Sequence, residues 1–403
     1  NGFAFLGDVR ELVYANPAEY GWEVPGDYNT LVGRAPWIEG PWVTKHNGKY
    51  YLQYAGPGTE FKSYADAVYL SEFPLGPFML QKHNPAMYKP EGFAAGAGHG
   101  SSFADAYGNF WHIGTMTISQ KHMFERRLGM FPVFLDEDGT YYTITKYGDY
   151  PYIVPAGKIH SFENVFSGWM LLTYNKPVVV SSSVDSLPVC NMTDEDIRTY
   201  WAAASGDAGE YAIVDMGDFF DVYALQVNFA EHNALIRGSQ KGACQRFTVE
   251  YSLDGNTWEM LEDRSDNNTD NSHVYMQLEE KVLCRYLKIS NIEVSGGHFA
   301  LSGFRAFGKG AGPLPGRITR FLAQRNLLDK RSVTLSWSKA DHATGYNISY
   351  GTERNKLYLN HMVYSDTTLV INSLNSNLDY YFTIESFNEN GITPNQQIVK
   401  DFE

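Results

Sequence analysis

The sequence is poor in cysteine and in long apolar runs. Its three cysteines, Cys190, Cys244 and Cys284, fall in the middle of the chain, and an odd number cannot pair completely. We interpret them as small buried residues that form at most one disulfide. No run approaches the roughly 18 apolar residues of a membrane-spanning helix. The chain starts at Asn1 without a Met and without a visible signal peptide, so we expect that an upstream part has been removed.

Basic charge is also scarce. The 403 residues include 32 Lys and Arg against 46 Asp and Glu, which gives a formal net charge of −14, and no basic run stands out. This balance argues against nucleic acid as a partner. Aromatic residues are instead abundant, with 28 Tyr and 8 Trp. An acidic chain rich in aromatic residues favours carbohydrate binding, and its length predicts about two to four domains.

One carboxylate stands among aromatic residues near the start of the chain. Glu39 lies between Trp37 and Trp42. A carboxyl group against indole rings loses hydration, so we expect a raised pKa that suits proton donation near neutral pH. We expect both tryptophans to bind substrate, because their faces stack well on sugar rings. On chemistry alone an alternative stays open, in which Glu39 is a surface carboxylate in a turn and the tryptophans are core.

The residues after Glu39 predict a turn and then a hairpin. Gly40-Pro41 reverses the backbone, and Asn47-Gly48 separates two short runs with residues that tolerate positive φ. Glu39-Gly-Pro-Trp followed by Gly48-Lys-Tyr-Tyr-Leu resembles the third blade of family 43 glycoside hydrolases. These are five-bladed β-propellers that hydrolyse glycosidic bonds with inversion. The resemblance extends to about residue 155 and implies that Glu39 is the general acid.

A loose internal repeat supports a propeller. Residues 47–52, 107–112 and 138–143 each have a turn, a glycine and then an aromatic strand. Short strands with turn signals and repeated aromatics are typical of propeller blades. We therefore assign residues 1–174 to the downstream part of a family 43-like catalytic domain, with about three of the five blades.

Two further motifs of this part are candidates for the site. His99 lies in the glycine-rich segment 96–102, where it could bind a metal or substrate or simply cap its own turn. The segment resembles the fourth blade of family 43, which implies that His99 lies on the pocket floor beside a central Ca²⁺ or its water. Residues 124–131 are similar to the start of the fifth blade, where an Arg reaches the site. Neighbouring strand residues point to opposite faces, and of Arg126 and Arg127 we select Arg127 as substrate-binding.

The composition changes near residue 175, and strand-like alternation continues to 309. This part resembles a discoidin (coagulation factor 5/8 type C) domain, an eight-stranded jelly-roll β-sandwich. The resemblance implies that Asp194, Asp196 and Thr199 form a structural Ca²⁺ site, and hard oxygen ligands at close spacing suit that ion. Many relatives complete this cage with a Glu near the end of the domain, where residues 301–305 here read Leu-Ser-Gly-Phe-Arg. We therefore expect modest affinity.

The last part of the chain, residues 315–403, follows a linker at 310–316. Apolar and polar residues alternate regularly in its predicted strands, and it contains Trp337 and a Leu six residues before Tyr380. This pattern resembles a fibronectin type III domain, an immunoglobulin-like β-sandwich. The domain carries no recognisable chemistry, and we interpret it as a spacer. The fold class of the whole chain is therefore all-β.

The set of catalytic carboxylates is incomplete in this sequence. Inversion requires two carboxylates that flank the bond, and the family takes its general base and a second Asp from upstream blades. Only 38 residues precede Glu39, and we interpret Asp8, Glu23 and Asp27 among them as solvated loop residues. We expect upstream blades or a complementary chain to complete the propeller, because exposed blade edges favour aggregation.

Our hypothesis is a secreted, periplasmic or cell-surface glycoside hydrolase. The substrate would be an oligosaccharide or polysaccharide with arabinose, xylose or galactose side chains. We expect the enzyme to need no organic cofactor. His232 and Arg237 are the candidates for sugar binding in the discoidin-like part. The alternatives are a non-catalytic carbohydrate-binding protein and an adhesion protein.

Overall fold

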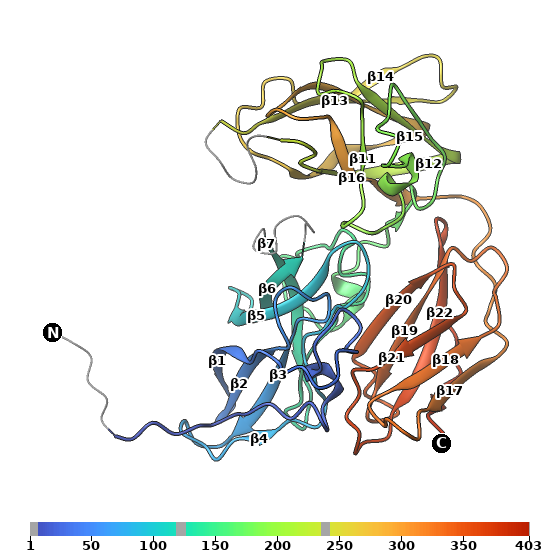
Figure 1. Ribbon diagram of the computed structural model, residues 1–403. Helices are drawn as coiled ribbons and strands as arrows, with labels where there is room; N and C mark the ends of the chain where they lie inside the picture. Colours follow the sequence, from blue (N-terminus) through green and yellow to red (C-terminus); the bar gives the residue numbers. More distant parts are fainter. Residues whose placement is uncertain (1–6, 118–125, 235–241, 403) are drawn as a thin grey trace.

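The computed structural model describes residues 7–117, 126–234 and 242–402, which form three β-rich units (Figure 1). Two four-stranded sheets lie beside a C-terminal sandwich, and a larger sheet assembly caps both. Helices in the described part are limited to single 3₁₀ turns, at Gly21–Glu23, Phe162–Asn164 and Val189–Met192. None of them has the length and apolar character needed to cross a membrane.

The first sheet contains the predicted hairpin. Asn47 and Gly48 have φ values of 46° and 81° and join the first two strands, with His46 paired to Lys49. The prediction is therefore confirmed, because these residues enter the left-handed region at little cost. The strands, in their order across the sheet, are β1 (Glu39–His46), β2 (Lys49–Gly56), β3 (Ala65–Ser71) and β4 (Met79–Leu80).

The second sheet also has four antiparallel strands. They are β5 (Ala95–Ala104), β6 (Phe110–Thr117), β7 (Arg126–Leu135) and β8 (Tyr141–Thr143), in this order. The third aromatic repeat, 138–143, forms the β7–β8 turn and β8 rather than a new blade. The described residues before Met170 thus hold two four-stranded sheets, and the expectation of about three blades was wrong. A turn, a glycine and an aromatic strand mark any hairpin, whether it lies within a blade or begins one.

The two sheets pack face to face around a polar centre. The buried Gln53 of β2 donates through Nε2 to Ser102 Oγ (2.8 Å) and to Tyr141 OH (2.7 Å) in the other sheet. Apolar side chains surround these bonds, including Val68, Met87 and Phe131. Buried polar groups are stable when hydrogen-bonded, so this network fixes how the two sheets meet.

The middle unit is an eight-stranded antiparallel assembly around one large apolar core. Its two longest strands, of 19 and 22 residues, bend at register shifts and so reach across the assembly. The three cysteines lie in this unit and are free; Cys190 is exposed, which corrects its predicted burial. The strands are β9 (Met170–Leu171), β10 (Val178–Val180), β11 (Trp201–Ala202), β12 (Tyr211–Phe229), β13 (Gln245–Ser252), β14 (Glu259–Asp263), β15 (His273–Val294) and β16 (Ala300–Lys309).

The C-terminal unit is a sandwich of a three-stranded and a five-stranded sheet. Trp337, Leu374 and Tyr380 all lie in its core, as their spacing predicted. Its assignment to the fibronectin type III family stays a prediction. The first sheet consists of β17 (Phe321–Arg325), β18 (Val333–Trp337) and β21 (Thr368–Ile371), and the second of β19 (Gly345–Gly351), β20 (Leu359–Tyr364), β22 (Tyr381–Asn388), β23 (Gly391–Thr393) and β24 (Val399–Lys400).

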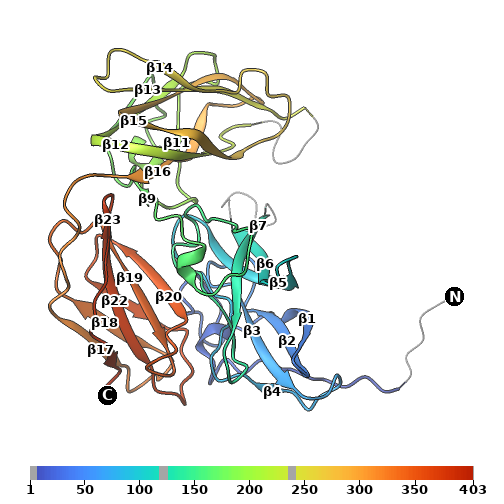
Figure 2. The same cartoon turned by 180° about the vertical axis from the view of Figure 1, so that it is seen from behind.

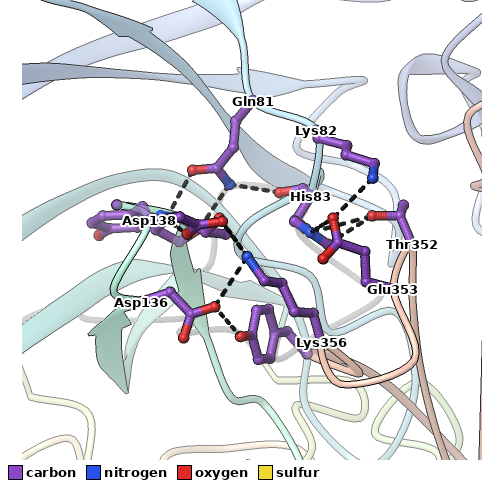
Figure 3. A network of polar contacts seen from close by, with 12 residues as sticks. Gln81, Lys82, His83, Asp136, Asp138, Thr352, Glu353 and Lys356 are labelled. Carbon is purple, nitrogen blue, oxygen red and sulfur yellow. Dashed lines mark hydrogen bonds and ion pairs between the residues drawn. The ribbon is translucent and has the colours of Figure 1, made fainter.

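This sandwich lies beside the part of the chain that holds the two four-stranded sheets, here called the propeller-like part, and is not a free spacer (Figure 2). Lys356 pairs with Asp138 and, at 3.3 Å, with Asp136 of the β7–β8 turn (Figure 3). The Tyr358 ring stacks on Tyr142 with centroids 3.5 Å apart. Sequence patterns within one domain carry no signal for such a contact, because each partner reads as an ordinary surface residue.

A buried ion cluster joins the middle unit to the propeller-like part. The guanidinium of Arg305 in β16 donates to both carboxylate oxygens of Glu195, at 2.9 and 2.8 Å. It also lies 3.3 Å from Asp149 Oδ2 and over the ring of Phe93. Asp149 in turn pairs with the buried Lys89 at 3.1 Å. These charges neutralise one another, as buried charges must.

Candidate active site

Glu39 begins β1, and three donors surround its carboxylate. Tyr64 OH donates to Oε1 at 2.6 Å, and Trp37 Nε1 donates to Oε2 at 2.9 Å. His99 Nδ1 lies 3.4 Å from Oε1. The structure thus brings together Glu39, Trp37 and His99, which come from two different sheets. Tyr64 was missed from the sequence, because a Tyr just before a strand carries no signal of its own.

The environment lowers the pKa of Glu39. Partial burial acts to raise this pKa, but hydrogen bonds from Tyr64, Trp37 and His99 together outweigh it. The predicted rise was therefore wrong for this arrangement. Trp37 is 67% exposed and meets the carboxylate with its N–H edge. It therefore stabilises the ionised form instead of removing water from it.

An open hollow of about 440 Å³ lies over this carboxylate. Its lining comes from the segment before β1, from the first residue of β1, from the β2–β3 connection and from β5. The residues are Arg34, Ala35, Trp37, Glu39, Pro57, Gly58, Thr59, Glu60, Phe61 and His99. Arg34 pairs with Glu60 at 3.0 Å on the rim. Among the described residues of the lining, Glu60 is the one carboxylate besides Glu39. An exposed indole and a carboxylate in one hollow suit a sugar ring and its oxygens.

Two other predicted substrate residues lie elsewhere. Trp42 turns toward the second sheet, where its Nε1 donates to Ser102 O at 3.2 Å, and it is absent from the lining of the hollow. Arg127 also lies outside the lining, and its Nη2 is 3.5 Å from Ser272 Oγ of the middle unit. The substrate role of each stays a prediction.

Backbone geometry places His99 against Glu39. His99 has a φ of 52°, and Asp66 Oδ2 accepts the N–H of the next residue, Gly100, at 2.9 Å. A Cβ at Gly40 would lie 2.8 Å from His99 Cδ2, so only glycine fits there. Burial raises the pKa of Asp66 to about 7, although backbone hydrogen bonds from Gly100 and His99 oppose the rise. Asp66 thus supports the turn that carries His99.

Glu23 and Asp27 upstream of Glu39 have structural partners, whereas Asp8 is exposed, as interpreted. Glu23 is fully buried and accepts a hydrogen bond from Tyr54 OH at 2.7 Å. Burial raises its pKa to about 6, while the bonds from Tyr54 and Asn16 lower it. The interpretation of Glu23 as solvated was wrong, because residues 20–24 fold against the first sheet. Asp27 pairs with Arg198 and is also not free in solvent.

The predicted calcium loop is compact but offers few ligands. Thr199 Oγ1 donates to Asp194 Oδ2 at 2.6 Å, and Asp196 N donates to Asp194 Oδ1 at 2.9 Å. Burial raises the pKa of Asp194, against these bonds. In the described part of the chain no group of three or more His, Cys, Asp or Glu is placed to hold a metal. The loop supplies three side-chain ligands where Ca²⁺ takes six to eight, so backbone or water oxygens would have to complete the shell.

Millimolar calcium should raise the melting temperature of this chain slightly relative to chelator. A cation between Asp194 and Asp196 would relieve their repulsion and stabilise only the folded state, by about 1.4 kcal/mol at ten times the dissociation constant. Calorimetry with and without calcium measures this shift. Asp194→Asn should abolish it, which separates this loop from any ion at His99. Coincident melting curves for the unaltered chain would show that hydrogen bonds alone hold the loop.

Several polar and aromatic side chains of the kind that bind sugars lie together in the loops of the middle unit. Tyr200 OH lies 3.1 Å from His232 Nδ1, and the rings of His232 and His298 meet edge to face. Asn233 Nδ2 lies 3.3 Å from His232 Nε2. Arg237 falls outside the described residues. Tyr200 and His298 come from distant positions of the chain, which explains why the sequence did not group them with His232.

Comparisons with known proteins agree with two of the three units. Residues 24–141 match the family model described as "Glycosyl hydrolases family 43", and residues 178–302 match "F5/8 type C domain". No curated protein matches the chain. A solved structure described as "Glycoside hydrolase" is 20% identical with a TM-score of 0.37, over 68% of this chain and 61% of its own length.

Smaller solved structures match about a third of the chain. A chitosan-binding module 1 from a chitosanase/glucanase of Paenibacillus sp. IK-5 is 18% identical (TM-score 0.30, 34% of this chain, 99% of its own). The family 32 CBM of C. perfringens NanJ, in complex with galactose, is 13% identical (TM-score 0.29, 34% and 98%). The family matches thus make residues 24–141 similar to family 43 glycosyl hydrolases and residues 178–302 similar to F5/8 type C domains.

Proposed function

We propose that this chain supplies the general-acid side of a secreted or surface glycoside hydrolase that cleaves with inversion. The observation that carries this is Glu39, held by Tyr64, Trp37 and His99 on an open hollow within the family 43 domain. Glu39 would protonate the leaving oxygen of the glycosidic bond. The substrates would be polysaccharide side chains of the arabinose, xylose or galactose type.

The base would come from outside the described site. Glu60, the other carboxylate of the lining, is held by Arg34 on the rim. An inverting base must activate water on the opposite side of the sugar, and the first and second blades of the family carry the Asp residues for this. We propose that an upstream segment or a second polypeptide supplies them, with Ca²⁺ near His99 as the expected central ion.

The chain should bind arabino-, xylo- or galacto-oligosaccharides at the Glu39 hollow even without a base. Trp37→Ala should weaken this binding about tenfold, or about 1.4 kcal/mol, because the exposed indole loses its stacking surface. Trp42→Ala should weaken it less than Trp37→Ala does, since Trp42 is outside the lining. Titration calorimetry with each variant measures the difference.

The same titrations test the non-catalytic alternative. In this alternative the protein only binds sugar, through His232 and its neighbours Tyr200 and His298 in the F5/8 type C domain. Loss of all sugar affinity in His232→Ala, with Trp37→Ala unaffected, would favour that alternative over the hydrolase.

A further inference from the structure

The loop predicted to bind calcium also touches the propeller-like part. Arg198 follows Asp196 in this loop, and its guanidinium forms a forked pair with Asp27, at 2.5 and 3.2 Å. Its Nη2 also donates to the backbone oxygen of Glu60 at 3.3 Å. The Arg198 side chain is only 14% exposed. A half-buried forked pair of this kind fixes geometry as well as charge.

One partner of Arg198, Glu60, lines the Glu39 hollow, and the other, Asp27, binds the chain just after it. Asp27 Oδ1 also accepts the backbone N–H of Lys62, at 2.8 Å. Lys62 Nζ reaches back to Asp196 Oδ1 at 3.4 Å. The residues just before Lys62, 57–61, line the hollow. These contacts therefore join three segments of the chain next to this wall: the segment around Asp27, residues 60–62 and the 194–199 loop.

We propose that Arg198 is a positioning residue for the Glu39 hollow, so that the F5/8 type C domain holds the wall formed by residues 57–61. The wall carries Phe61, over which Arg34 lies at 5.2 Å from the ring centre, and Glu60, to which Arg34 is paired. Without Arg198, Asp27 loses its cation and the Glu60 carbonyl loses a donor. Residues 57–61 would then be held mainly by the local backbone hydrogen bonds of their own segment, such as Phe61 N to Gly58 O. The consequence for sugar binding rests on the proposed function; the positioning of the wall does not.

Hydrogen exchange in the full chain tests the positioning directly. In Arg198→Met the amides of residues 58–64 should exchange about tenfold faster, because the acceptor of the Lys62 N–H is no longer fixed. Arg198→Lys keeps the charge but not the fork and should show an intermediate rate. Arg246→Met is the matched control, because Arg246 forms an exposed pair with Glu293 in the same domain. It should leave residues 58–64 unchanged.

The outcomes separate the inference from the proposed function. Unchanged exchange at residues 58–64 in Arg198→Met would overturn the inference; should that variant not fold, unchanged exchange in Arg198→Lys would do so. A global rise in exchange, shared by all three units, would also overturn it, because Arg198 would then only stabilise the fold. A local rise supports it whether or not the chain binds sugar. If sugar binds at the hollow, Arg198→Met should weaken that binding while Arg246→Met does not.

Discussion

Replacement of Glu39 by Gln should lower the rate on a natural oligosaccharide about 100- to 10,000-fold in the enzyme that includes the base. Gln keeps the shape, because its oxygen can accept the Trp37 N–H while its amide donates to the Tyr64 oxygen, but it cannot deliver a proton. Aryl glycosides with good leaving groups should lose much less, because they need little protonation. Steady-state kinetics with both substrate classes measure the contrast.

Glu60→Gln is the matched control for this experiment. It removes a carboxylate from the same hollow, and we expect rates within a few-fold of the unaltered enzyme. The pH profile adds a second criterion, because a general acid must hold its proton. The donors around Glu39 lower its pKa here, and a neighbouring Asp from the proposed upstream segment or second polypeptide would raise it. An unchanged rate of Glu39→Gln on a natural oligosaccharide would reject the assignment.

Arg305→Met should destabilise the protein by about 3–5 kcal/mol. The change leaves Glu195 buried without a cation and Asp149 with Lys89 alone, and an uncompensated buried charge is costly. The melting temperature is the appropriate measure, since a protein of several units need not unfold in two states. Arg285→Met is the control, because its pair with Asp215 is more exposed and should contribute less than about 1 kcal/mol.

The stability lost in Arg305→Met should depend on pH, and the pKa of Glu195 gives the direction. The pKa of Glu195 is raised by burial even though Arg305 lowers it, and without Arg305 it would rise further. A carboxyl whose folded pKa exceeds its unfolded pKa destabilises the fold above the unfolded value, and the penalty disappears as the group becomes protonated. The deficit of Arg305→Met should therefore shrink from pH 8 toward pH 5. A double variant with Glu195→Gln should recover part of the stability, and equal deficits at both pH values would contradict this account.

Local sequence patterns predicted the elements that depend on local chemistry. The Asn47-Gly48 turn and the core position of Trp337 follow from backbone preference and from alternation, and both are confirmed. The proximity of Glu39 and His99 came from the family resemblance rather than from spacing. What failed depends on contacts between residues far apart in the sequence: the lowered pKa of Glu39 requires Tyr64, and the burial of Glu23 requires Tyr54. The spacing of these residues in the sequence follows no helix or strand periodicity, so no pattern indicates that they meet.

The docking of the C-terminal sandwich has an evolutionary consequence. Tyr358 lies face to face on Tyr142, and Glu385 binds both Lys146 and Tyr147. A gene that lost the sandwich would expose these aromatic rings and leave cations without partners. Exchange of this segment between genes should therefore be selected against unless both surfaces change in step. Among homologues, substitutions at positions 142 and 358 should covary, and the segment should accompany the propeller-like part through gene rearrangement.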